Sequence, residues 1–325
     1  MSGLPVGRRS RYENPGTAWS ADEVAILSDA VLHAPSVQNT RPWSLTLQER
    51  TAVLSELAEV PLPEQDLEGR DRRISCGAAL ENLVLAVRSL GWAADVDVRV
   101  AGGAVTATVI GARRAVVTQV ENRRFRAISD RRSHRPAFGS RAVSEDIRDS
   151  VRSAATSPGV VGRWISGHIE ALAMGWMLDY AARVLQADYQ RALSMWCQAA
   201  PRGAAEQQVD FGLDKDAFTA TGLGAIGLVT SHPHVPDACQ LAAQIECESV
   251  LVISTRADEP YDHVRAGEAV EDAWLEATSR GLVASIMTQP LHLAEVRTRL
   301  EDLLDGMAVP QALMRFGYPD PHRRH

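Results

Sequence analysis

Residues 77–91 read GAALENLVLAVRSLG, and residues 267–281 read GEAVEDAWLEATSRG. The two segments align without a gap at an offset of 190 residues, from Gly77 to Gly267. Apolar residues recur at helical spacing in both, so each segment is predicted to be a helix that ends at a glycine, Gly91 or Gly281. The identical pairs are Gly77 and Gly267, Ala79 and Ala269, Glu81 and Glu271, Leu85 and Leu275, Ser89 and Ser279, and Gly91 and Gly281. This repeat indicates duplication and fusion of one ancestral half.

Other elements surround the two repeated helices. In the first half, Ser20 and Glu23 form a capping-box pattern, a short strand covers 45–47, and alternating residues predict a hairpin over 94–100 and 104–110. In the second half, the patterns predict a helix over 168–198, strands over 248–255 and 311–319, and a helix near 292–304. Trp176, Trp196 and Trp274 fall on apolar helical faces and are expected in the core. The expected fold is α+β, with a lid-like insertion near 201–231.

Composition excludes several classes of function. The 325 residues carry a formal net charge of -7 and are 45% hydrophobic, which argues against a nucleic-acid partner. No stretch approaches the roughly 20 uninterrupted apolar residues of a spanning helix, and no apolar h-region follows the first charged residues. We therefore expect a cytoplasmic protein with no membrane contact.

The segment Arg131-Arg132-Ser133-His134-Arg135 gathers guanidinium groups and a hydroxyl just ahead of a helix predicted to begin near Ser144. Such a cluster suits a dianion, because arginine forms charge-assisted, forked hydrogen bonds to phosphate. The alternative is a solvated, charged turn. The cluster alone does not decide between these two interpretations.

A second segment, APSVQNTRPW at 34–43, combines two prolines, side-chain amides and a hydroxyl next to an indole. One interpretation is a helix stop and turn followed by a core tryptophan. The other is a set of donors directed at a planar heterocycle. Composition does not choose between them.

A family resemblance favours the ligand-binding interpretation of both segments. APSVQNTRPW resembles the APSxxNxQPW segment of FMN-dependent nitroreductases, and RRSHRPAF resembles the RRSxRxF opening of the same family. The second repeated helix and the ending RFGYP also resemble that family. Because APSxxN precedes RRS here, and because of the repeat, the chain resembles the Acg branch, whose members are fused pseudo-dimers associated with dormancy responses. The resemblance implies a nitroreductase-like fold with halves 1–120 and 121–325, and a monomeric pseudo-dimer.

The resemblance also implies an FMN site between the halves. Arg131 and Ser133 would hold the FMN phosphate with Arg132 close by, and Arg135 would face the N1/C2=O edge of the isoalloxazine. The backbone from Ser285 to Met287 would face flavin N5, and Arg323 or Arg324 would add a C-terminal phosphate contact. From the other half, the residues expected to contact the flavin are Pro35, Ser36, Gln38 and Asn39.

One such site is expected. The second-half counterpart of APSxxN, near 156–160, has no asparagine and no following Pro-Trp, so that site should be empty even if Arg8-Arg9-Ser10-Arg11 is a relic of its phosphate segment. No metal site is expected, because His232, His234 and Cys239 lack a fourth ligand at a recognisable spacing.

Three functions remain. The resemblance favours FMN storage or sequestration with little reductase activity, because reductase activity in the Acg branch is doubtful. The alternative is an NAD(P)H-dependent FMN oxidoreductase, in which hydride passes to flavin N5 and then to a nitroaromatic or quinone. A third is an interaction protein with a vestigial flavin site.

Overall fold

The computed structural model describes residues 18–59, 66, 68–199, 222–226, 236–306 and 308–320, and for 188–199 it describes only the helical backbone. Within these residues the strands form two four-stranded antiparallel sheets. The first contains β1 (Trp43–Gln48), β2 (Thr51–Glu56), β3 (Trp92–Ala101) and β4 (Ala104–Arg114) in the order β1-β2-β4-β3. The second contains β5 (Val160–Trp164), β6 (Ser249–Thr255), β7 (Val283–Met287) and β8 (Val309–Gly317) in the order β5-β6-β8-β7. The shared order of first, second, fourth and third strand confirms an α+β fold of two like halves.

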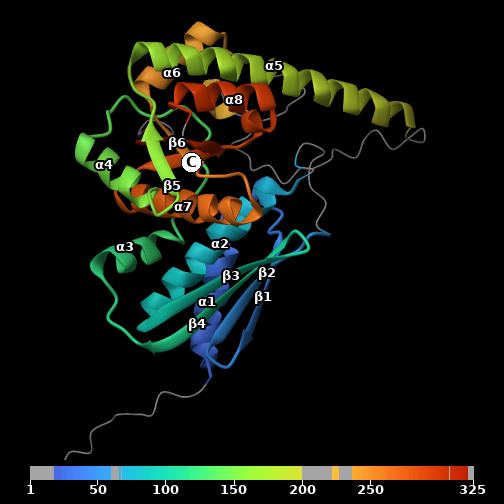
Figure 1. Ribbon diagram of the computed structural model, residues 1–325. Coiled ribbons are helices and arrows are strands. Elements are labelled where there is room, and N and C mark those ends of the chain that lie inside the picture. The colour runs from blue at the N-terminus through green and yellow to red at the C-terminus, as the bar shows by residue number, and fades with distance from the viewer. Residues whose placement is uncertain are drawn as a thin grey trace, which may run out of the picture.

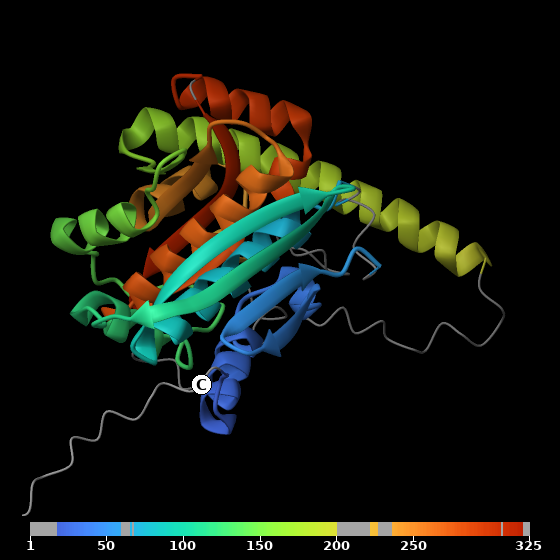
Figure 2. The ribbon, with the colours of Figure 1, turned by 60° about the horizontal axis from the view of Figure 1, so that its bottom comes forward.

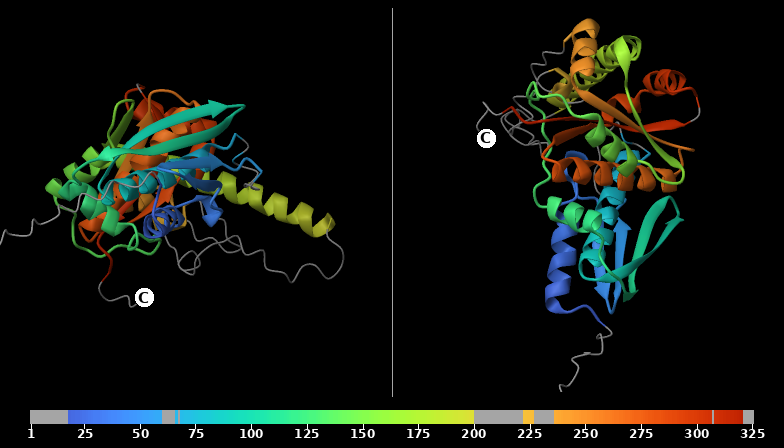
Figure 3. Two further views of the ribbon diagram at one scale, coloured as in Figure 1. Left: turned by 90° about the horizontal axis from the view of Figure 1, so that it is seen from below. Right: turned by 90° about the vertical axis from the view of Figure 1, so that its left-hand side faces the viewer.

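Two long helices, α2 (Arg70–Ser89) and α7 (Pro260–Ser279), lie between the sheets (Figure 1; Figure 3, right). Their bounds differ by the same 190 residues as the sequence repeat. They cross at Gly77 and Gly267, where a Cβ on Gly77 would lie 2.0 Å from the Val264 carbonyl and one on Gly267 would lie 2.0 Å from the Ile74 carbonyl. Since Ile74 and Val264 are also repeat equivalents, the crossing is symmetric. The two copies of the sequence repeat are therefore related in space by a pseudo-two-fold axis.

Several local predictions are confirmed. Helix α1 (Ala21–Leu32) begins at the N-cap Ser20 with the capping box to Glu23 complete. The β3–β4 hairpin turns at Gly102 and Gly103, both of which have positive φ. Helix α4 (Glu145–Ala154) begins after Ser144. The capping box at Ser20 and the turn at Gly102–Gly103 formed as predicted because caps and glycine turns are decided by neighbouring residues.

The second half carries the larger insertions. Along the chain, helices α5 (Gly167–Ala199) and α6 (Ala238–Cys247) come between β5 and β6, and α8 (Ala294–Leu303) comes between β7 and β8. A further helix, α3 (Gln119–Ala127), links the halves. Figure 2 shows α5 extending beyond the rest of the described elements. Most of the predicted lid-like insertion lies outside the described residues, apart from 222–226.

One core prediction was wrong. Trp176 is 59% exposed, because α5 turns Met174, Met177 and Leu178 inward instead. Trp274 is fully buried as predicted, and the side chain of Trp196 lies outside the described part of the chain. Helical spacing identifies an apolar face but does not show which residues a neighbouring helix will cover.

The two halves share their cores. The cluster around the first sheet includes Val264 and Leu275 of α7, and the cluster around the second sheet includes Ile74 of α2. Each sheet therefore packs on helices of both halves, and the division near residue 120 stays a prediction. No helix among the described residues combines the length and apolar character needed to cross a lipid bilayer.

Candidate functional site

The two motif segments touch. Arg131 follows α3, and its Nη2 donates a hydrogen bond of 2.9 Å to the carbonyl of His33, 98 residues away in sequence. His33 is the C-cap of α1 and directly precedes the segment 34–43. The fold thus brings RRSHR and APSVQN together at the junction of the two halves.

The second motif forms a tight turn supported by α2. The N–H of Val37 donates to Ser75 Oγ at 3.0 Å, and the Ser36 hydroxyl accepts the N–H of Arg41 at 3.0 Å. Gln38 and Asn39 lie in the 3-10 helix η1 (Val37–Asn39) with φ of 47° and 56°. Left-handed backbone costs a residue with a Cβ roughly 1–2 kcal/mol, so the surrounding contacts must hold this turn.

The turn presents amide groups to the outside. The side chains of Gln38 and Asn39 are exposed and make no hydrogen bond within the described part of the chain. The Ser133 hydroxyl, from the other motif, also has no hydrogen-bond partner among the described residues. A carboxamide both donates and accepts, so these three groups can serve a polar ligand.

The RRSHR segment is fixed to the second sheet. Ser133 forms a parallel bridge to Ala284 at the start of β7, and the N–H of His134 donates to the Ala284 carbonyl at 2.8 Å. Arg315 of β8 lies underneath, 1% exposed. Its guanidinium donates to the carbonyls of His134, Arg135 and Pro136.

Arg315 was not predicted as a site residue. Besides the three carbonyls it donates to Ser285 Oγ at 2.9 Å and to the Glu248 carboxylate at 3.1 Å. Burial lowers the pKa of Arg315, while Glu248 raises it. The signal in the sequence was an arginine inside the apolar strand ALMRFG, because a buried arginine requires several acceptors.

The third predicted segment, Ser285 to Met287, lies in β7, where Ser285 and Met287 are buried and Ile286 is partly buried. The Ser285 hydroxyl accepts a hydrogen bond from Arg315, and the predicted contact of the 285–287 backbone with flavin N5 stays a prediction. Just beyond it, the Thr288 hydroxyl donates to Asp71 at 2.5 Å and the Thr288 carbonyl accepts from Arg70 at 3.1 Å. The first turns of α2 therefore hold both the 36–41 turn and the end of β7.

Asp71 makes most of the side-chain contacts between the start of α2 and the segment after β7. Its carboxylate also lies 3.0 Å from His292 Nε2 and 3.2 Å from Arg70. Burial raises the pKa of Asp71, but His292, Arg70 and Thr288 outweigh burial and lower it to about 2. These residues were missed because nothing local in the sequence joins α2 to the segment after β7.

A metal ion is a poor occupant of this cluster. Possible ligand atoms of Asp66, Asp71 and His292 lie within 4.8 Å of one another. Asp66, however, already accepts the N–H groups of Asp71 and Arg72, and the Arg70 guanidinium competes with any cation for Asp71. His232 and His234 lie outside the described residues, and Cys239 is exposed.

The predicted arginines take different places. Arg131 is 8% exposed, with its guanidinium 4.7 Å from the Trp274 ring and 3.6 Å from Glu271, so its predicted contact with the FMN phosphate stays a prediction. Arg132 is exposed and folds back onto the carbonyls of Ser129 and Arg131. Arg323 and Arg324 lie outside the described residues, as do Arg8 to Arg11.

At the symmetric position in the second half, a larger side chain takes the place of a small one. Arg265, the repeat equivalent of Ser75, donates to Ser157 Oγ at 2.8 Å and to the Pro158 carbonyl at 3.3 Å. Ser75 offers a hydroxyl to the 36–41 turn, whereas Arg265 fills the matching space with a guanidinium. The pseudo-symmetry of the fold therefore does not extend to the chemistry of the two turns.

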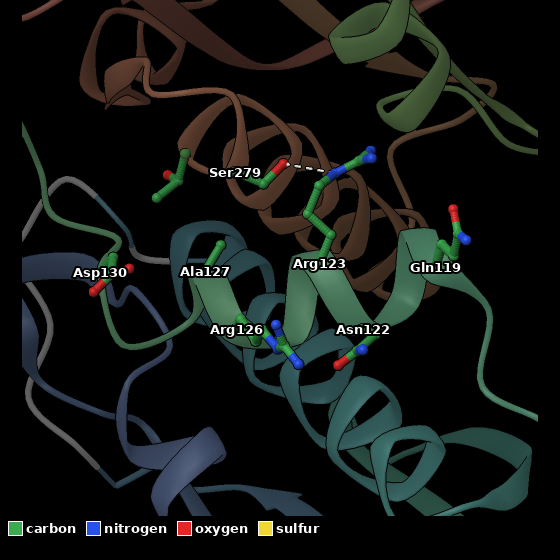
Figure 4. A pocket seen from close by; sticks show the side chains of 8 residues that line it. Gln119, Asn122, Arg123, Arg126, Ala127, Asp130 and Ser279 are labelled. Atoms are coloured by element: carbon green, nitrogen blue, oxygen red, sulfur yellow. Dashed lines mark hydrogen bonds between the residues drawn. The ribbon is translucent and has the colours of Figure 1, made fainter.

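A pocket of about 370 Å³ lies on α3 and the end of α7 (Figure 4). Figure 4 shows Arg123 reaching Ser279 of α7, to which it donates at 3.1 Å. The pocket shares no residue with the three motif segments, although its Asp130 directly precedes Arg131. It is lined by Gln119, Asn122, Arg123, Arg126, Ala127, Asp130, Thr278 and Ser279.

Two like sheets, with the two motif segments meeting beside the helices between them, define a nitroreductase-like protein with two fused halves. The chain belongs to the nitroreductase family, because residues 128–318, more than half of it, match the profile described as "Nitroreductase family". It is similar to two Mycobacterium tuberculosis proteins that are provisionally named NAD(P)H nitroreductases. It is 26% identical to Rv3131 over 92% of this chain and 86% of that protein. It is 24% identical to acg over 93% of this chain and 91% of that protein.

Solved structures give a weaker likeness. NfnB from Mycobacterium smegmatis in complex with NADPH is 15% identical, with a TM-score of 0.36 over 62% of this chain and 90% of that chain. A Bacteroides fragilis nitroreductase with bound FMN is 13% identical, with a TM-score of 0.37 over 64% of this chain and 92% of that chain. TM-scores this low carry no argument about the present chain.

Proposed function

We propose that the chain binds one FMN between its halves and stores or sequesters it, with little NAD(P)H reductase activity. The observation that carries the proposal is the hydrogen bond from Arg131 to the His33 carbonyl, which joins the RRSHR and APSVQN segments. Residues 98 apart in the sequence meet here, as a site shared between two halves requires. Family membership supports the choice of a flavin as ligand.

The groups available around this junction suit FMN. The Ser133 hydroxyl and the arginines beside it match a phosphate, and the carboxamides of Gln38 and Asn39 match the donors and acceptors on the edge of a flavin. When bound, FMN would supply hydride and electron transfer at its ring. Arg135 would place a positive charge by the ring, which favours the reduced, anionic form. Strain in the 36–41 turn further supports a binding role, because strained backbone gathers at functional sites.

The preference for storage comes from the segment against Arg135. The 3-10 helix η4 (Gly222–Ala225) packs so closely on it that a Cβ on Gly224 would lie 1.8 Å from the Arg135 carbonyl. Leu223 in this helix is fully buried, and its N–H donates to Gln244 of α6 at 2.9 Å. A well-packed cover beside the flavin would exclude nicotinamide, which must stack on the ring to deliver hydride.

The second candidate function is an NAD(P)H-dependent FMN oxidoreductase, which the names of the mycobacterial relatives favour. The two functions differ in whether a dinucleotide reaches the ring. The deciding measurement is the visible spectrum and FMN stoichiometry of the purified protein, followed by anaerobic addition of NADPH or NADH. Dithionite serves as the control, because a small reductant should bleach the flavin in either case.

Storage predicts about one FMN per chain that stays yellow with either dinucleotide and bleaches with dithionite. Rapid bleaching by NADPH or NADH would overturn storage and establish the oxidoreductase. Absence of FMN from the purified protein, together with failure of the apoprotein to bind added FMN, would refute both functions and leave an interaction protein.

The site assignment has its own test. The double variant Arg131→Ala, Ser133→Ala should lose FMN retention, because it removes charge-assisted bonds worth roughly 1.5–3 kcal/mol each. Asn39→Ala should weaken binding less, because it removes one bond worth about 1 kcal/mol net. Arg126→Ala is the matched control, since Arg126 is exposed and lines the pocket on α3 instead. Unchanged FMN content in the double variant would contradict the assignment.

A further inference from the structure

A buried carboxyl group on α7 faces Arg131, the arginine proposed to hold the FMN phosphate. Glu271 of α7 is fully buried, and neither of its carboxylate oxygens accepts a hydrogen bond of normal geometry within the described part of the chain. Arg131 Nε lies 3.6 Å from it and is likewise buried without a hydrogen-bond partner there. A charge so poorly solvated depends on the counter-ion beside it, Arg131.

The groups around Glu271 explain this dependence. Asn82 and Glu81 of α2 face it from across the helix crossing, and Asp272 directly follows it on α7. The amide of Asn82 is already directed to the Ala30 carbonyl of α1, at 3.1 Å. None of these three groups is a cation, and within the described part of the chain Arg131 is the cation that lies against Glu271.

The other arginines of this helix interface serve other acids. Arg124 donates to Asp272 at 2.6 Å, and both Arg123 and Arg124 donate to Glu276. The pseudo-two-fold axis relates Glu271 to Glu81, whose neighbouring cation is Arg124 rather than Arg131. The repeat therefore supplies a matched pair of glutamates, one facing the proposed phosphate arginine and one facing away from it.

The protonation of Glu271 is poised near neutrality. Burial raises the pKa of Glu271 to about 7, with Arg131 and Asn82 offsetting burial only in part and Asp272 adding to it. Burial, together with Asp272 and Glu268, also raises the pKa of Glu81 well above its ordinary value. Small changes in the field at Arg131 will thus change the charge of Glu271.

We propose that Glu271 takes up a proton when the FMN phosphate binds at Arg131, so that binding of FMN is coupled to protonation of this buried carboxyl. The inference rests on the proposed function, because it requires FMN at this site. The phosphate brings about two negative charges to Arg131, the cation that lies against Glu271. One proton then moves from solvent to a Glu271 oxygen, and the buried carboxyl becomes neutral beside the now phosphate-paired arginine.

The expected effect is an uptake on the order of half a proton or more per FMN at about pH 7.5, because Glu271 passes from mostly ionised to mostly protonated. Calorimetric titration of FMN into the flavin-free protein measures it. The heat is compared in PIPES and Tris, two phosphate-free buffers that differ in ionisation enthalpy. Riboflavin, which has the ring without the phosphate, should bind without uptake.

Two variants show whether Glu271 is the group that takes up the proton. Glu271→Gln should abolish the uptake, and Glu81→Gln, the symmetric control, should retain it. Uptake that persists in Glu271→Gln, or disappears in Glu81→Gln, would overturn the proposal. If Glu271→Gln does not fold, the wild-type protein still decides: FMN affinity must weaken between about pH 7 and pH 8.5, while riboflavin affinity stays constant.

Failure of the inference and failure of the proposed function give different results. Tight FMN binding without net proton uptake in wild type would refute the coupling and leave the FMN function standing. No heat and no retained flavin in any buffer would refute the proposed function itself.

Discussion

The crossing of α2 and α7 leaves no room for a single added carbon atom at either of its glycines. A Cβ at Gly77 would lie 2.0 Å from the Val264 carbonyl and 2.9 Å from Gly267 Cα, and a Cβ at Gly267 would lie 2.0 Å from the Ile74 carbonyl. Each clash is with backbone, which no rotamer change can relieve. Gly77→Ala or Gly267→Ala should therefore destabilise the protein even though alanine is the better helix former.

The magnitude follows from the geometry. Real Cβ contacts below 3.0 Å essentially do not occur, so the two helices must part by about 1 Å. Overpacking typically costs 1–3 kcal/mol, and a backbone clash belongs at about 3 kcal/mol. Replacing glycine by alanine inside a helix returns about 1 kcal/mol. We expect a net loss of about 2 kcal/mol for either variant.

Urea unfolding followed by far-UV circular dichroism measures this loss. Because the two glycines are symmetry equivalents, the single variants should agree within about 0.5 kcal/mol, and the double variant should cost less than their sum, since the helices part only once. Thr298→Ala, exposed on α8, is a control that should stay within about 0.5 kcal/mol of wild type. Either glycine variant as stable as wild type would refute the reasoning.

Three further predictions concern buried charges. Arg315→Met should lose about 3–5 kcal/mol of stability in urea, because it leaves Glu248 and three carbonyls without the arginine donor. It should also weaken the FMN binding proposed above, and a variant with wild-type stability and wild-type FMN binding would contradict this. Asp71→Asn should lower the free energy of unfolding by about 2 kcal/mol at neutral pH but by little near pH 2, because the lowered pKa of Asp71, about 2, stabilises the fold only above that range. The free energies of unfolding of the variant and the wild type, measured from pH 7 to pH 2, should therefore converge, and a difference that stays constant would contradict this. Burial raises the pKa of Glu268 to about 7 despite Arg265, so ionisation of Glu268 destabilises the fold as pH rises. Relative to wild type, Glu268→Gln should therefore become more stable from about pH 5 to pH 8. A stability difference that does not change with pH would contradict this prediction.

The candidate site could be predicted only segment by segment. The APSVQN and RRSHR patterns identified two surfaces, but their contact depends on Arg131 reaching His33 across the fold. Arg315 and Asp71 were missed because, apart from Arg70 beside Asp71, their side-chain partners lie 30 to 221 residues away in the sequence. An arginine in an apolar strand signals that acceptors are needed, but no local pattern names the distant partners, since any polar residue can accept or donate once the fold places it.

The sequence by itself determined many of the elements and the repetition of the central helix. The capping box at Ser20, the glycine turn at 102–103 and the offset of 190 residues rest on local chemistry and on direct repetition, so they needed no tertiary information. Only the tertiary structure decided that Trp176 faces solvent, that Gly77 and Gly267 meet, and that Glu271 lies buried beside Arg131. The physical reason is that packing chooses which side of each helix is covered, and burial then sets the charge of the groups it encloses.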